Sequence, residues 1–589
     1  MKFRNFKAVM KPVARFLLPY KVPLALVMLA GTASSILGLL IPGQVQSIAD
    51  AIRDGLEGSF DYDSINRNII ISAVIVVLLF IFSLIFNRRI EHYAQSVCRD
   101  IRSAINKKLD RTDLLSFNAV SAGDLIARMT EDVDKIGTAI SKAVGPLLQN
   151  VVLFVAAVVL MLVKCPPLAA VVVGLVALGA AASSLIARKA IPLQQAQRAN
   201  LAKMNAVVDE SLSGHLIIKS YHAENRMIES FETINHAYAQ KLRKGQIILK
   251  LLSPIMLIVN NTAYVLICII GAYMMFNGIG SVTIGVLVAF ILYAKMLAIP
   301  VSFFAGIMSQ LTLSYVSASK ITEFLSLPEM ADDGKESPEK PRGEVIFENV
   351  RFGYEKDVEI IHGFNAKVSP GMKVAVVGPT GAGKTTLVNL LMRFFELNGG
   401  SIKIDGVSIS EMPRKELHTI LGMVLQDTFL FSRSIRDNIV CYAENVTDEQ
   451  INDAVKKCGL DFLISTLPNG LDTVLTENTS VSAGQKQLIT IARAMIRDPA
   501  ILILDEATSS VDTRTELLIQ KALDELMNGK TSFVIAHRLS TIKNADMIFV
   551  MSDGDIVETG THEELLGKGG LYAELYYSQF DDGDSENKT

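Results

Sequence analysis

The chain has 589 residues, which is too long for one hydrophobic core and indicates two to four domains. Half of the residues are apolar and the mean hydropathy is +0.35, which argues against a wholly soluble protein and points to membrane segments. The formal net charge of −3 hides a basic part, +12 over residues 1–325, and an acidic remainder of −15. We therefore expect a membrane domain joined to a cytoplasmic domain and no nucleic-acid partner, since the basic residues flank apolar runs.

Six apolar runs are long enough to cross a bilayer. The second, residues 69–86, has 18 residues without a charge, or about 27 Å of helix. The first follows a basic N-terminus as in a signal peptide, but it is too long for one, so we expect a retained membrane helix. The predicted spans are residues 22–45, 69–86, 144–163, 168–187, 251–276 and 282–311.

The distribution of Lys and Arg predicts the orientation of these spans. Loops 87–143 and 188–250 carry ten each, whereas loop 46–68 carries two. Because basic loops stay on the cytoplasmic side, we expect a multi-pass protein of the plasma membrane with both termini and the soluble domain inside. The two basic loops read as helical, with breaks at 116–125 and 212–224 that predict exposed turns able to dock on another domain. Plain solvated loops are the alternative.

Few polar groups interrupt the spans. Lys295 lies thirteen residues into the sixth span, and Asn260 and Asn261 lie in the fifth. A charge at this depth is costly unless it faces a partner or a wet cavity, so these three are candidates for contact with a transported substrate. A structural ion pair, a snorkelling lysine or asparagines that bridge helices are the alternatives.

The soluble part is predicted to follow a charged linker, residues 326–343, and to cover residues 344–580, before an acidic tail at 581–589. Within it, the stretch GPTGAGKTT at 378–386 fits the pattern G-x-x-x-x-G-K-[ST] between a buried strand and a helix. Glycines there let backbone N–H groups close round phosphates, Lys384 reaches the terminal phosphates, and Thr385 is a ligand for Mg²⁺.

A second motif, ILILDEATSSVD at 501–512, is a central strand that ends in two acids. Ligands bind at the carboxyl ends of the strands in open α/β sheets. Asp505 is therefore expected in the Mg²⁺ shell, and Glu506 is expected to polarise the attacking water.

With both motifs in place, the soluble part resembles the nucleotide-binding domain of an ABC transporter. Nearly the whole chain resembles a type IV ABC exporter half-transporter, which has six spans fused ahead of one ATPase domain. The resemblance implies a multi-domain fold: an all-α six-helix membrane domain plus an α/β P-loop ATPase domain. It also implies that the two loop breaks carry the coupling helices.

The resemblance further assigns roles to residues. The residues expected to contact ATP are Tyr354, Gly378, Pro379, Thr380, Gly381, Ala382, Gly383, Lys384, Thr385, Thr386, Ser482, Gly484, Gln485 and Asp512. The expected catalytic residues are Glu506, His537 and Gln426, and the expected Mg²⁺ ligands are Thr385, Gln426 and Asp505. Glu477 falls near a further family motif from which TENTS departs.

The stretch VSAGQ at 481–485 matches the ABC signature, usually LSGGQ, with Ala483 in place of the first glycine. A Cβ there can hinder a close backbone approach or a positive φ. The catalytic set matches the active pattern, so the chain resembles the competent subunit of a heterodimeric multidrug exporter, and its signature would complete a partner's ATP site. A homodimer with a tolerant signature, such as a lipid flippase, is the rival.

The sequence therefore predicts an ATP-driven exporter of amphipathic or hydrophobic compounds, of drug, lipid or peptide type, that works by alternating access as a dimer. An ATP-gated channel or regulator is the alternative from another functional class.

Overall fold

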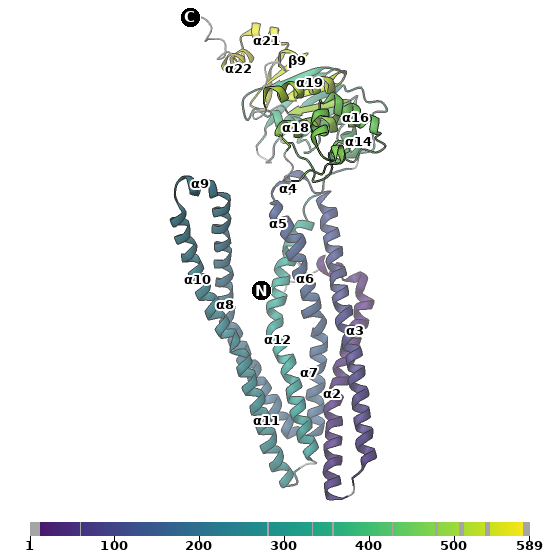
Figure 1. The fold of residues 1–589 in the computed structure, drawn as a ribbon, viewed down its shortest axis with the longest axis vertical. Helices are drawn as coiled ribbons and strands as arrows, with labels where there is room; N and C mark the ends of the chain where they lie inside the picture. Colours follow the sequence, from purple (N-terminus) through teal and green to yellow (C-terminus); the bar gives the residue numbers. More distant parts are fainter. Residues whose placement is uncertain are drawn as a thin grey trace. The chain divides into compact units, whose positions relative to one another are not determined.

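The computed structural model describes residues 12–58, 60–279, 282–332, 334–355, 358–426, 428–476, 481–505, 512–535 and 542–580. The chain divides into two compact units (Figure 1). The first comprises Met1–Asp110 and Val120–Leu327, and the second comprises Arg111–Ala119 and Pro328–Thr589. A short segment from between two helices of the first unit thus belongs to the second. The expected boundaries at residues 325 and 343 stay predictions.

The first unit is helical. In the described part of the chain, six helical stretches are long and apolar enough to cross a membrane, as the sequence predicts. The helices exceed the predicted spans: α3 and α8 have 48 residues each, or about 72 Å, against about 30 Å of bilayer hydrocarbon. The long helices are α2 (Lys21–Glu57), α3 (Tyr62–Leu109), α7 (Gly145–Lys164), α8 (Pro166–Ser213), α10 (Glu224–Lys250), α11 (Leu252–Phe276) and α12 (Ile284–Leu325).

Small residues let the helices of the first unit approach closely. A Cβ on Gly31 of α2 would lie only 2.6 Å from the Phe86 ring of α3, so this crossing requires glycine. The buried apolar core lies between α2, α7, α8, α11 and α12, with Phe290 and Tyr293 among its largest side chains. Figure 1 shows α8, α10 and α11 as an arm that diverges from the bundle of α2, α3, α7 and α12.

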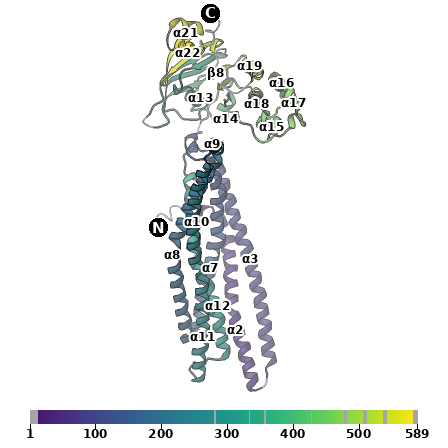
Figure 2. The same ribbon diagram turned by 60° about the vertical axis from the view of Figure 1, so that its left-hand side comes forward.

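The helix that leads into α7 is irregular. It starts with α5 (Ala122–Ala127) and α6 (Val133–Ala139), and the π-helical turns η2 (Arg128–Asp132) and η3 (Ile140–Val144) follow them. Asp132 in η2 is buried, and Ser317 of α12 donates a hydrogen bond to its Oδ1 at 2.7 Å. This contact holds α12 against the irregular helix. In the arm formed by α8, α10 and α11, the short helix α9 (His215–Ser220) joins α8 to α10 (Figure 2).

The segment Arg111–Ala119, with helix α4 (Leu114–Asn118), folds as part of the second unit. The backbone N–H of Met330 donates to the carbonyl of Arg111 at 2.8 Å, and Thr112 forms a β-bridge with Glu329. Leu114 packs against an apolar core of the unit. The predicted break at 116–125 therefore starts inside the second unit and ends in the first.

The second unit contains two sheets. A four-stranded antiparallel sheet has the order β2-β1-β4-β5, and a six-stranded sheet has the order β10-β9-β3-β8-β7-β6. The strands are β1 (Val345–Phe352), β2 (Ile361–Val368), β3 (Lys373–Val377), β4 (Gly399–Ile404), β5 (Val407–Ser408), β6 (Leu421–Val424), β7 (Ile501–Asp505), β8 (Thr531–Ile535), β9 (Met547–Ser552) and β10 (Asp555–Gly560).

In the larger sheet all strands but β10 run parallel. Consecutive residues of β3, β7 and β8 are buried, so both faces of these strands are covered, as parallel strands between helices require. Helices of this unit are α13 (Lys384–Leu391), α14 (Arg414–Ile420), α15 (Ile435–Val440), α16 (Asp448–Lys457), α17 (Asp461–Thr466), α18 (Ala483–Arg497), α19 (Thr513–Met527), α21 (His562–Lys568) and α22 (Leu571–Phe580). The predicted fold class, a six-helix membrane unit plus an α/β ATPase unit, is confirmed.

Candidate functional site

The glycine-rich loop joins the end of β3 to the start of α13. Gly378, Gly381 and Gly383 have positive φ values of 155°, 89° and 95°, which favour glycine. At Gly378 a Cβ would also lie 2.2 Å from the carbonyl oxygen of Met551. The loop therefore takes the glycine-dependent path that directs backbone N–H groups inward at a helix N-terminus, where a phosphate is favoured.

Lys384, the first residue of α13, folds back over this loop. Its Nζ donates to the carbonyl oxygens of Gly378 at 2.6 Å and Pro379 at 2.9 Å. Burial lowers the pKa of the Lys384 amine below its usual value, and the negative charge of Asp505 acts in the opposite direction. The amine thus lies at the mouth of the loop, within the electrostatic range of Asp505.

Tyr354, which follows β1, lies beside the loop. Its hydroxyl and Thr386 Oγ1 are 3.2 Å apart and share a hydrogen bond. The ring makes edge contacts with Phe352 and Phe395, whose centroids lie 5.0 and 5.2 Å away. Tyr354 is 39% exposed, so part of this fixed aromatic residue is open to a planar ligand.

Two predicted metal ligands follow parallel strands of the larger sheet. Asp505 ends β7, and the exposed Gln426 comes two residues after β6. Because β6 and β7 pair in parallel, and β8 links β7 to β3, these ends and the phosphate loop lie on the same edge of the sheet. Thr385 lies at the start of α13, directly after the phosphate loop, so these three residues would offer Mg²⁺ the oxygen donors that it prefers. These residues fit such an ion, which would offset phosphate charge when bound.

The signature stretch forms the N-terminus of α18. Ser482 is the N-cap: its Oγ accepts from the Gln485 N–H at 3.2 Å, and Gln485 Oε1 accepts from the Ser482 N–H at 3.0 Å. Ala483 is the first helical residue and has no positive φ, so its Cβ fits the local backbone. Gly484 is buried. A positive φ at Ala483, one of the two expected obstacles, is absent.

Asp512 is the N-cap residue of α19 (Thr513–Met527). Its Oδ2 accepts from the Thr515 N–H at 3.0 Å. Hydrogen bonds from the side chain and the backbone of Thr515 lower the pKa of this carboxyl. Its predicted contact with ATP stays a prediction. Glu506, His537 and Glu477 lie outside the described residues.

The three candidate substrate residues lie on two helices of the first unit. Lys295 is exposed on α12, on the face opposite the buried Tyr293 and Leu297. Asn260 is half-buried and Asn261 is exposed on α11. Among the described residues none of the three takes part in a hydrogen bond or an ion pair. Their role in substrate binding stays a prediction.

An arginine cluster that anchors the linker was missed by the sequence reasoning. Arg393, next to the C-cap of α13, is 3% exposed and donates through Nη1 to the carbonyls of Ile409 at 3.0 Å and Met412 at 2.8 Å. Arg414 contacts Glu396 and the carbonyl of Arg393. Isolated arginines between apolar residues look like surface charges in a sequence, so no pattern there indicates burial.

The comparisons with known proteins match both units. Residues 24–301 match the family described as ABC transporter transmembrane region, and residues 361–509 match the family described as ABC transporter. A fatty acid ABC transporter ATP-binding/permease protein of Mycobacterium bovis is 38% identical over 81% of this chain and 75% of its own. An ATP-dependent lipid A-core flippase of Desulfotalea psychrophila is 34% identical over 97% of this chain and 100% of its own.

A solved structure, a bacterial Atm1-family ABC exporter with ATP bound, matches 96% of this chain and 98% of its own with a TM-score of 0.76 and 27% identity. The predicted order, six spanning helices and then one ATPase unit, is thus shared along almost the full length. The chain belongs to the ABC transporter family, as an ATP-hydrolysing exporter half-transporter of the type IV fold.

Proposed function

We propose that this chain is one half of a dimeric exporter that moves amphipathic or hydrophobic compounds, with lipids and fatty acids foremost, out of the cell across the plasma membrane. The membrane domain would cover residues 1–325 and the ATPase domain residues 344–580. The names of the fatty acid transporter and the lipid flippase support the substrate class. The basic loops 87–143 and 188–250 support a cytoplasmic ATPase domain.

The observation that carries the proposal is the placement of Arg111–Ala119. This segment joins the membrane-length helix α3 to the helix that leads into α7, yet it folds within the unit that holds the phosphate loop. A movement of the ATPase unit must therefore displace the chain between two spans. That linkage is what alternating access driven by ATP requires. An ATP-gated channel would need the same linkage, so the transport assay below separates the two.

A second copy or a related chain is needed to complete the ATP site. Gln426, Asp505, Thr385 and Lys384 would hold ATP and Mg²⁺ from one side, and Ser482 at the start of α18 would close over the γ-phosphate of an ATP held by the partner. Glu506 would orient the attacking water and His537 would contact the γ-phosphate.

Exposed apolar surfaces support the same dimer. Leu216, Ile217 and Tyr221 in and after α9 are 79%, 64% and 81% exposed. Beside Gln426, Leu425 and Phe429 border a hollow of about 350 Å³ and are 49% and 67% exposed. We propose that α9 of each chain docks in this hollow on the partner, because exposed apolar groups of this size favour an interface.

The altered signature favours a heterodimer, in which Ala483 would close over a partner's weaker ATP site. The homodimer remains the alternative, favoured by the helical φ of Ala483. The variant Ala483→Gly separates them. In a heterodimer, Ala483→Gly changes turnover only at the ATP site held by the partner. The effect should therefore disappear when the partner's catalytic glutamate is replaced by glutamine. In a homodimer of the chain expressed alone it raises turnover at both sites.

Transport in proteoliposomes tests the proposed function. The purified protein, with any co-purifying chain, should move a fluorescent fatty acid or lipid against its gradient when Mg²⁺ and ATP are present. Glu506→Gln should abolish that movement while ATP still binds. Flux that only runs down the gradient, and that persists in Glu506→Gln, would instead establish the channel alternative.

A further inference from the structure

A pair of arginines lies on the exposed side of α3 where its uncharged run ends. Residues 69–86 carry no charge, and Arg88 and Arg89 follow one residue later. Both are exposed, and among the described residues neither forms a hydrogen bond or an ion pair. The nearest acid on the helix, Glu91, instead accepts a hydrogen bond from Gln95 Nε2 at 3.0 Å. Two adjacent guanidinium groups thus lack a counter-charge from the part of the chain that the structure describes.

The position of Arg88 and Arg89 along the membrane normal follows from the contact between α3 and α7. Ile90, the residue after Arg89, is buried, and a Cβ on Gly145 would lie 2.8 Å from Ile90 Cγ1. Gly145 starts α7, whose apolar run is the third predicted span. The arginines of α3 therefore lie level with the first turn of another span. That level is the cytoplasmic boundary of the hydrocarbon layer, where lipid phosphates lie.

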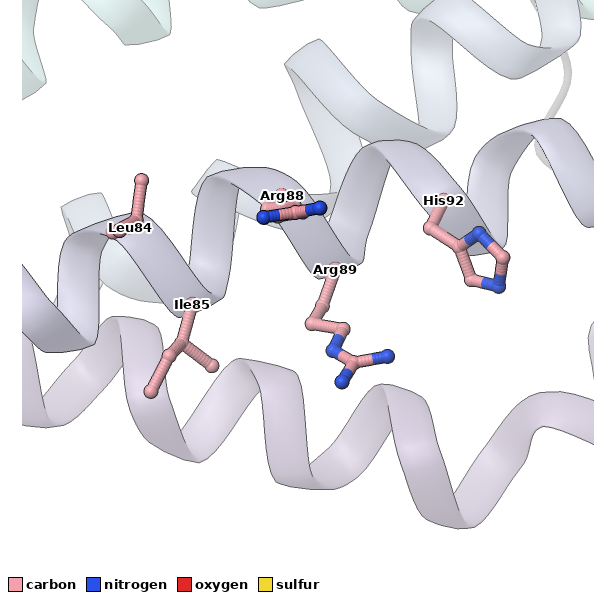
Figure 3. A pocket seen from close by; sticks show the side chains of 5 residues that line it. All are labelled: Leu84, Ile85, Arg88, Arg89 and His92. Atoms are coloured by element: carbon pink, nitrogen blue, oxygen red, sulfur yellow. The ribbon is translucent and has the colours of Figure 1, made fainter.

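The arginines share a hollow with apolar neighbours. An open hollow of about 540 Å³ is lined by Leu84, Ile85, Arg88, Arg89 and His92. Figure 3 shows that Ile85, Arg89 and His92 extend from one side of the helix and that Arg88 lies next to Arg89. Leu84 and Ile85, one turn toward the span, are 52% and 43% exposed. The hollow thus has a cationic end in the boundary region and an apolar end toward the bilayer.

We propose that this hollow binds the headgroup of an anionic phospholipid of the cytoplasmic leaflet. Arg88 and Arg89 would pair with the phosphate, for which the guanidinium fork is suited. His92 would add an N–H donor at the headgroup, and Leu84 and Ile85 would contact the start of an acyl chain. The apolar end favours a lipid over free phosphate, because free phosphate has nothing to place there.

The site is formed by α3, whereas the proposed substrate residues belong to α11 and α12 and the ATP site belongs to the second unit, so the proposal goes beyond the proposed function. It is tested by lipid binding alone. Native mass spectrometry of the detergent-purified full-length protein should show a phosphatidylglycerol adduct that persists at lipid concentrations where phosphatidylcholine gives none. Arg88→Gln with Arg89→Gln should weaken that adduct about 30-fold, at about 1 kcal/mol per basic residue near a membrane surface.

Two matched variants serve as controls for this experiment. Lys107→Gln removes an exposed basic residue further along the same helix and should keep the wild-type affinity. Arg88→Lys with Arg89→Lys keeps the charge but loses the fork, and should give an intermediate affinity. Unchanged ATP binding in each variant shows that it has folded.

Several outcomes would overturn the proposal. Equal affinity of the Gln double variant and the wild type would remove the arginines from the site. Displacement of the adduct by millimolar inorganic phosphate would show a free-anion site instead. If Arg88 and Arg89 are protected from an arginine-specific labelling reagent in a lipid-free dimer, a second chain covers this face of α3.

Discussion

Arg414 donates a hydrogen bond from Nε to the main-chain carbonyl of Ala331 at 3.0 Å and so ties the linker to the ATPase unit. The backbone N–H of Arg414 also donates to Asp332 Oδ1 at 2.8 Å. Through its contact with the carbonyl of Arg393, the same side chain reaches the residue that follows the C-cap of α13, the helix that begins at the phosphate loop. The linker after α12 is therefore connected by side chains to the C-terminal end of α13, whose N-terminal end holds the phosphate loop.

We expect Arg414→Met to weaken coupling between ATP hydrolysis and transport. The substitution removes the side-chain donor to the carbonyl of Arg393, at a cost of about 1–3 kcal/mol for a buried group. It also leaves Arg393 as the remaining side-chain donor to the carbonyl of Ala331 and to Glu396. Substrate stimulation of the ATPase should fall more than the ATPase without substrate, and the unfolding temperature should drop by several degrees. The matched control is Lys367→Met, which removes an exposed ion pair with Glu344 and should do neither. Normal stimulation in Arg414→Met would show that the anchor is only structural.

Lys384 should make ATP binding sensitive to alkaline pH. Its pKa is lowered by burial, so ATP affinity should fall as the pH rises through that lowered value and the amine loses its charge. Lys384→Arg stays charged, so its affinity should vary less between about pH 7 and about pH 10. Titration with a fluorescent ATP analogue at each pH measures this. Identical profiles for the two proteins would mean that another group controls the effect.

The lowered pKa of Lys384 should also make the stability of the nucleotide-free protein depend on pH, in the direction opposite to ATP affinity. Because the pKa of Lys384 is lower in the folded state, the unfolded chain binds more protons between the folded and unfolded values. Stability should therefore rise with pH across that window, just below the usual lysine value. The Arg variant should lack this rise in thermal unfolding, and a rise of the same size there would contradict the assignment.

Tyr354 should bind the base of ATP through its ring and not through its hydroxyl. Tyr354→Ala should weaken ATP binding about tenfold or more, since stacking of a base on an aromatic contributes about 1–3 kcal/mol. Tyr354→Phe keeps the ring but loses the contact with Thr386, so it should change affinity little. Isothermal titration with ATP checks both variants. Equal losses in Ala and Phe would assign the effect to the hydroxyl.

Lys295 should select substrates by charge. It is exposed on α12 with no acid partner in the described part of the chain, so its ammonium is available to an anionic headgroup. Lys295→Ala should raise the KM for anionic amphiphiles relative to neutral analogues of the same chain length. Lys295→Arg should preserve the preference. A parallel change for both substrate classes in transport assays would remove Lys295 from the substrate path.

Much of this fold follows from patterns that depend on local residues. The uncharged run at 69–86 predicts α3, and VAVV followed by GPTGAGKTT predicts β3, the phosphate loop and α13. These signals are strong because a span needs its full length of apolar residues, and a phosphate loop needs glycines at fixed positions. The same reasoning places Asp505 at the end of a buried strand, as observed.

Other features depend on contacts between distant parts of the chain. The membership of Arg111–Ala119 in the second unit arises from pairing with residues near 330, more than 200 positions away. The π-helical turns η2 and η3 have ordinary helical composition, so no residue pattern marks them. The helical φ of Ala483 depends on the cap formed by Ser482, which a comparison of signature letters does not show.

The central claim is that ATP closes two half-sites from separate chains. The most direct test is the mass of the ATP-trapped particle, measured by light scattering on Glu506→Gln protein, with its nucleotide content counted by chromatography. The account predicts a particle with two half-transporter chains and two ATP molecules, whether the second chain is another copy or a co-purified partner. A particle of one chain that retains ATP in a closed site would contradict it.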